Sequence, residues 1–110
     1  MVEVSEAGKG IFLMKIKKPE VHTLDVPDLK EEMQKIIKDK GIKKLVLDLT
    51  EVRTITSSGI GIFLNINQTL KSGFRIVNPS LEVRNVLELT KLDSIVKIFE
   101  TVDIAVKSFS

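Results

Sequence analysis

Three consecutive hydroxyl side chains, Thr56, Ser57 and Ser58, precede Gly59 and Gly61 and are the part of this sequence with the clearest chemical potential. An apolar run at helical spacing follows directly, so the hydroxyls should lie at a loop-to-helix junction. Free backbone N–H groups at a helix start favour an anionic group. A phosphate on a serine there would add about −1.5 to −2 charges without melting the helix. The two glycines would let another backbone approach closely, so the segment is a candidate surface for contact with a partner.

Other interpretations of the same segment are open. Ser57 and Ser58 could serve only as helix caps. The run Gly59-Ile60-Gly61 is not a dinucleotide-binding fingerprint, because the third glycine position is occupied by Leu64. A hydrolase would need Ser57 to contact His22, the only histidine of the chain. We therefore expect a binding protein and not an enzyme.

The composition narrows the function classes further. Seventeen basic and fifteen acidic residues give a net charge of only +2, which does not indicate nucleic acid or an anionic membrane as a partner. Without cysteine and with one histidine, the chain has no thiolate chemistry and no multi-histidine metal site. No apolar run approaches the ~20 residues of a membrane span, and no secretory signal is visible. We expect a cytoplasmic protein without a cofactor or metal.

The elements that must position the hydroxyls follow from the hydrophobic pattern. The motif follows an apolar strand at 45–49, in which Asp48 is expected to be a strand-end carboxylate bonded to loop N–H groups. The helix that starts near Asp25 should stop at Gly41. Further strands are expected at 2–5, 11–16, 74–77 and 95–99, and further helices at 60–70, 80–89 and 101–109. Ser80 and Thr101 should cap the last two helices. The helix at 80–89 should turn an apolar stripe inward, formed by Leu81, Val86, Leu87 and Leu89. This order of strands and helices predicts one α/β domain over residues 1–110, with a mixed, mostly parallel sheet and about four helices packed mainly on one side.

The segment LVLDLTEVRTITSSGIGIFL at residues 45–64 resembles the STAS domain (sulphate transporter and anti-sigma factor antagonist), especially the free-standing bacterial anti-sigma factor antagonists. In that family a buried strand ends in Asp-Leu, and a short loop leads to an Asp-Ser-Ser/Ala-Gly-Leu-Gly motif that opens a helix. The stretches at 25–29 and 86–93 also resemble the family, so the resemblance covers nearly the whole chain. It implies a STAS-like (SpoIIAA-like) fold.

The resemblance also implies a function and a set of residues. Ser57 matches the serine that an anti-sigma factor with serine-kinase activity phosphorylates, and the unmodified form captures that partner. The protein would be a monomer or weak dimer and would need no cofactor, because ATP belongs to the kinase. The partner-binding surface would surround Ser57 and comprise Thr56, Ser58, Gly59, Gly61, His22 and Asp25. Thr56 and His22 stand where the family has acidic residues. The absence of these two carboxylates should affect recognition by the kinase or transfer of the phosphoryl group. The alternatives are a constitutive interaction or scaffold module and a small-ligand or nucleotide-binding STAS domain.

Overall fold

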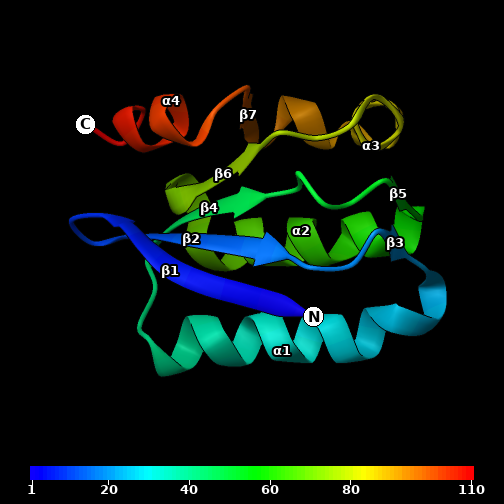
Figure 1. The fold of residues 1–110 in the computed structure, drawn as a ribbon, viewed down its shortest axis with the longest axis horizontal. Helices are drawn as coiled ribbons and strands as arrows, with labels where there is room; N and C mark the ends of the chain where they lie inside the picture. Colours follow the sequence, from blue (N-terminus) through cyan, green and yellow to red (C-terminus); the bar gives the residue numbers. More distant parts are fainter.

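A five-stranded sheet with the order β1-β2-β4-β6-β7 forms the centre of the computed structural model, which describes all 110 residues (Figure 1). β1 and β2 form an antiparallel hairpin, and every other neighbouring pair in the sheet is parallel. These strands are β1 (Val2–Gly8), β2 (Ile11–Ile16), β4 (Lys44–Asp48), β6 (Phe74–Val77) and β7 (Lys97–Phe99). The α/β class and the mixed, mostly parallel sheet are confirmed.

Three of the four α-helices pack on one face of this sheet and the fourth packs on the other. The helices are α1 (Val26–Asp39), α2 (Ser57–Leu70), α3 (Leu81–Leu89) and α4 (Val102–Lys107). Side chains of α1, α2 and α3 share one core of 22 buried residues with the sheet. α4 instead covers a small core of four buried residues, which include Val46, Val77 and Ala105. The prediction of helices mainly on one side is therefore confirmed.

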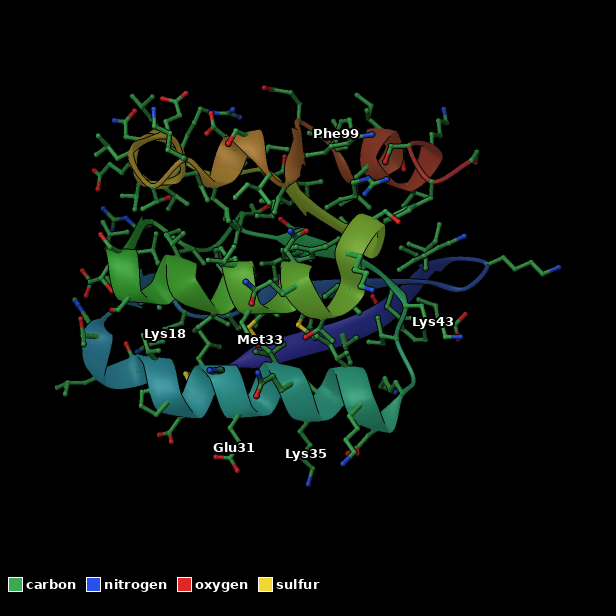
Figure 2. The ribbon with its side chains drawn as sticks, turned by 180° about the vertical axis from the view of Figure 1, so that it is seen from behind. Lys18, Glu31, Met33, Lys35, Lys43 and Phe99 are labelled. Carbon is green, nitrogen blue, oxygen red and sulfur yellow. The ribbon has the colours of Figure 1, made fainter.

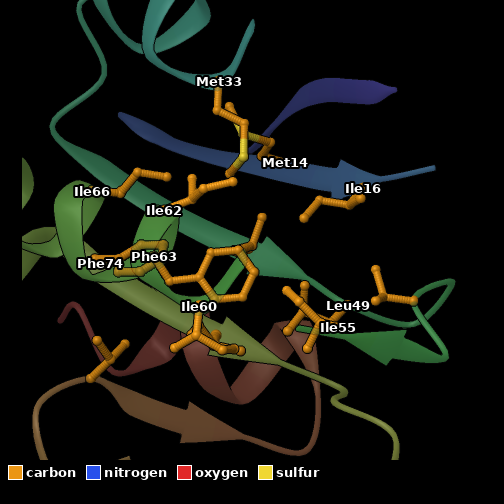
Figure 3. Close-up of a cluster of buried hydrophobic side chains, with 14 of the residues drawn as sticks. Met14, Ile16, Met33, Leu49, Ile55, Ile60, Ile62, Phe63, Ile66 and Phe74 are labelled. Atoms are coloured by element: carbon orange, nitrogen blue, oxygen red, sulfur yellow. The ribbon is translucent and has the colours of Figure 1, made fainter. Parts of the chain in front are cut away.

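The main core explains why α1 and α2 lie side by side over the sheet. Met33 of α1 points inward between the two helices, whereas Glu31 and Lys35 point to solvent, as expected of an amphipathic helix (Figure 2). Met33 meets Met14 of β2, next to the side chains of α2 (Figure 3). Burying a side chain of this size contributes about 1.5–3 kcal/mol. The position of α2, and so of its first turn, is fixed by this packing.

Helix α1 and strand β4 end with the residues and hydrogen bonds that the sequence predicted. Gly41 follows α1 with φ of +59°, and the N–H groups of Gly41 and Ile42 bond to the carbonyls of Lys38 and Ile37. This is the Schellman arrangement that glycine permits. Asp48, which is buried, accepts a hydrogen bond from the Thr50 backbone N–H at 2.9 Å. The expected role of Asp48 as a strand-end carboxylate is confirmed.

Part of the predicted apolar packing near the end of the chain is wrong. Leu81 and Leu89 were expected to face inward from α3 but are 76% and 82% exposed. At about 100° per residue they lie on the opposite side of the helix from Val83 and Leu87, which are buried. Ile95 was expected in a strand, but it lies before β7 and is 54% exposed.

Candidate functional site

A two-stranded parallel ribbon, separate from the main sheet, positions the loop that carries the hydroxyls. It consists of β3 (Glu20–Val21) and β5 (Thr54–Ile55), paired in the register Glu20 with Thr54 and Val21 with Ile55. One residue further on, the Thr56 N–H donates to the Val21 carbonyl at 3.1 Å. The ribbon therefore brings the chain before α1 against the start of α2 (Figure 1). Two-residue strands are too short to give a periodic signal, and the sequence did not predict them.

Thr56 is the N-cap of α2. Its backbone is extended, with φ of −82° and ψ of 162°, and its Oγ1 accepts a hydrogen bond from the Gly59 N–H at 3.4 Å. The interpretation of Ser57 and Ser58 as helix caps is wrong, because both lie within the first turn. Ser57 is exposed and its hydroxyl makes no hydrogen bond within the chain. The hydroxyl predicted as the switch is thus free.

The hydroxyl of Ser58, in contrast, is engaged by two neighbours. Its Oγ lies 2.9 Å from Thr56 Oγ1 and 3.1 Å from Thr23 Oγ1. Thr23 belongs to the 3-10 turn Thr23–Asp25 that leads into α1. Thr23 was not predicted from the sequence, because it is 35 residues away from Ser58 and reaches it only through the β3–β5 ribbon. The contacts make Ser58 a positioning residue of the loop, although it is exposed, and they leave Ser57 as the exposed hydroxyl without a partner within the chain.

The two glycines of the motif have different surroundings. Gly59 is buried, and a Cβ there would lie 2.6 Å from Ile55 Cγ1 and 3.2 Å from Val21 Cγ1. The expectation that Gly59 leaves room for a partner is therefore wrong, because its missing side chain makes room for the β3–β5 ribbon. Gly61 is exposed, and a Cβ there would meet no atom within 4 Å. Open space for a partner's backbone lies at Gly61.

His22 and Asp25 form the neighbouring rim and bond to each other. Asp25 Oδ2 accepts a hydrogen bond from the His22 backbone N–H at 2.9 Å, and Lys18 Nζ lies 3.6 Å from Asp25 Oδ1. The first of these contacts is the main cause that lowers the pKa of Asp25. The His22 ring lies 3.4 Å from Glu20 Oε1 and makes no hydrogen bond to Ser57. The hydrolase interpretation, which needs a Ser57–His22 contact, has no support.

An apolar hollow of about 170 Å³ lies beside Ser57, between α2 and the chain after α3. The walls of this hollow are formed by Ile60, Gly61, Leu64, Thr90, Leu92 and Ile95, together with Ser57. Leu64 is 38% exposed and Ile95 is 54% exposed. A free hydroxyl next to exposed apolar side chains suits protein–protein contact better than catalysis.

The chain shows neither a metal-binding cluster nor a membrane-spanning helix. No group of three or more His, Asp or Glu side chains is arranged to hold a metal ion. The longest α-helices, α1 and α2, have 14 residues each, and none of the helices combines the length and apolar character needed to cross a membrane.

Comparison with known proteins places this geometry in a family. The model of the STAS domain family matches residues 6–105. A candidate anti-sigma factor antagonist of Thermotoga maritima is 39% identical over 72 residues, which are 63% of this chain and 64% of that protein. A homologue from Thermotoga neapolitana is 38% identical over 72 residues, with the same coverage. The chain thus spans about 64% of the length of these curated relatives.

Solved structures support the same placement. The crystal structure of the candidate Thermotoga maritima antagonist has a TM-score of 0.86 and 28% identity, over 96% of this chain and 92% of that one. The anti-sigma factor antagonist SpoIIAA in its unphosphorylated form has a TM-score of 0.78 over 99% of this chain and 96% of its own. Its identity is 17%, so this likeness concerns the fold alone.

Proposed function

This chain belongs to the STAS domain family, and we propose that it is an anti-sigma factor antagonist that captures an anti-sigma factor of the serine-kinase type and is released by phosphorylation of Ser57. It works in the cytoplasm, as a monomer or weak dimer, with ATP supplied by the kinase. The relatives named as candidate anti-sigma factor antagonists support this proposal.

The observation that carries the proposal is the free Ser57 hydroxyl at the edge of the apolar hollow. Capture would bury Leu64 and Ile95, which are partly exposed in the free protein. A phosphate on Ser57 is tolerated by the start of α2, where helix dipole and N–H groups favour negative charge. In a complex the same phosphate would have to lose its water. An unmatched buried charge costs several kcal/mol, roughly a thousandfold in affinity.

The first test measures capture of the cognate anti-sigma factor by isothermal titration calorimetry. Ser57→Ala should bind like the unmodified protein, whereas Ser57→Glu should bind about a hundredfold more weakly because it brings one charge to the hollow. Gln68→Glu is the matched control, because it adds the same charge to an exposed position near the other end of α2. Equal affinity of Ser57→Glu and Gln68→Glu would place the interface away from Ser57.

A second candidate function is a constitutive interaction module that binds its partner without a phosphoswitch. It is favoured by Thr56 and His22, which stand where the family has acidic residues. The two candidates are separated by phosphate incorporation: a cognate kinase that modifies the wild type but not Ser57→Ala supports the switch. Capture without any incorporation supports the constitutive module.

A further inference from the structure

Arg75, on β6, is a buried cation without a counter-ion. Only 8% of the residue is exposed, and no carboxylate lies within ion-pair distance of it. Its Nε donates to Ser108 Oγ at 2.8 Å, and its Nη1 donates to the carbonyls of Ser72 and Phe74 at 2.7 and 3.1 Å. The Phe109 ring lies 4.2 Å from the guanidinium carbon. A buried charge held only by neutral groups is costly, and this burial lowers the pKa of Arg75.

One nitrogen of this guanidinium is left for a ligand. Nη2 makes no hydrogen bond within the chain. Since no fully buried side-chain nitrogen or oxygen lacks a partner, Nη2 must reach open space. Arg75 lines a hollow of about 290 Å³ together with Lys43, Lys44 and the two serines Ser72 and Ser108, and we take Nη2 to face this hollow. No acidic residue contributes to its walls.

The fold brings these groups together at the end of the sheet where strands β4 and β6 begin. Arg75 is in register with Val46, and Lys44 lies two residues before Val46, so both cations project to the α4 face. Gly73 brings Ser72 against Lys43, because a Cβ at Gly73 would overlap the Lys43 carbonyl oxygen. Figure 2 shows Lys43 at the opposite end of the molecule from Lys18, which pairs with the rim of the Ser57 site.

We propose that this hollow binds a small phosphate monoester, with the Arg75 guanidinium and the two lysines around the phosphoryl group and the serine hydroxyls as additional donors. Three cations suit a dianion better than a single carboxylate, and the planar guanidinium fits phosphoryl oxygens. A volume of about 290 Å³ leaves room beside the phosphoryl group for a body of only a few carbon atoms. The site is independent of the Ser57 surface and of the function proposed for it.

The test is a titration of the isotope-labelled protein with glycerol 3-phosphate, followed by amide NMR shifts at constant ionic strength. We expect saturable shifts at the starts of β4 and β6 and at Ser108, with a Kd on the order of 1 mM, as a few charge-assisted contacts would give. Succinate, a dicarboxylate dianion, should bind at least about fivefold more weakly. No saturable shift at these residues, or tighter binding of succinate, would overturn the proposal.

Charge-removing variants locate the site. Lys43→Gln and Lys44→Gln change exposed residues, and each should weaken glycerol 3-phosphate binding about fivefold. Lys40→Gln is the matched control, because Lys40 is exposed at the end of α1, a few residues before Lys43, but does not line the hollow. Equal loss of affinity in all three variants would indicate a non-specific charge effect and refute the site.

Arg75 needs a separate variant, because it also holds the chain after α4 through Ser108. Arg75→Lys keeps the charge but loses the guanidinium fork. We expect a folded protein by circular dichroism with about tenfold weaker glycerol 3-phosphate binding. Unchanged binding in a folded Arg75→Lys variant would mean that Arg75 only ties down the end of the chain, and the proposed site would fall.

Discussion

Gly59 and Gly61 lie on the same helix but should respond in opposite ways to replacement by alanine. Gly59 is packed against the β3–β5 ribbon, where a Cβ would lie 2.6 Å from Ile55 Cγ1 and 2.9 Å from Ile55 Cδ1. Carbon atoms in contact are normally about 3.5–4.0 Å apart, so Ile55 must move. At Gly61 the added methyl group would enter open space.

The magnitudes follow from this geometry. Overpacking of this kind costs about 1–3 kcal/mol, and the helix propensity of alanine returns up to about 1 kcal/mol. Gly59→Ala should therefore destabilise the protein by about 1–2 kcal/mol, which lowers Tm by about 4–9 °C for a chain of this size. Gly61→Ala has no overlap to offset, and it should stabilise the protein by about 0.5–1 kcal/mol.

The assay is thermal and urea unfolding followed by circular dichroism, because the chain has no tryptophan or tyrosine for fluorescence. The difference between the two variants should be about 1.5–3 kcal/mol. If Gly59→Ala were as stable as the wild type, the packing of the ribbon against α2 would not be as tight as described. If Gly61→Ala were destabilised, α2 would not be helical and open at that turn.

Three further predictions concern other parts of the chain. Gly73→Ala should lose at least about 3 kcal/mol of stability or fail to fold by circular dichroism, because its Cβ meets the backbone carbonyl of Lys43, which cannot rotate away. Since the pKa of Asp25 is lowered from its ordinary value of 3.8, its carboxylate stabilises the fold above about pH 4 and the contribution is lost as pH falls through the folded pKa. Asp25→Asn should therefore make Tm less acid-sensitive below about pH 4, and an unchanged acid profile would contradict this. Thr56→Asp should keep the cap of α2, restore a family carboxylate and speed phosphorylation of Ser57 by the cognate kinase, up to about a hundredfold if alignment is what limits the rate; an unchanged rate would show that this carboxylate does not matter.

Local signals were sufficient for the main elements of the fold. The continuous apolar run from Leu45 to Leu49 predicted the central strand, in which Leu45, Val46 and Leu47 are fully buried. Ser80 and Thr101 were predicted as caps of the last two helices, and both accept the expected backbone hydrogen bond. These features depend on neighbours within a few residues, so the sequence alone was enough.

The details of the site depended on contacts that are distant in sequence. Thr23 reaches Ser58 across 35 residues, and Gly59 is buried only because Val21 and Ile55 pack on it. The family resemblance located Ser57 at the start of α2, but it did not reveal which hydroxyl is free. That distinction required the positions of Thr23 and Thr56, which no local pattern encodes.

The β3–β5 ribbon has a consequence for the thermodynamics of association. It ties two loops to each other through backbone hydrogen bonds, with the Thr56 N–H continuing the ladder to Val21. Ordering the backbone of a free residue costs about 1–2 kcal/mol, and a partner that binds a loose loop must supply that free energy. In this protein, folding has already met the cost of ordering the two loops that β3 and β5 join. Binding at the Ser57 end should therefore carry a small entropic penalty and little backbone rearrangement.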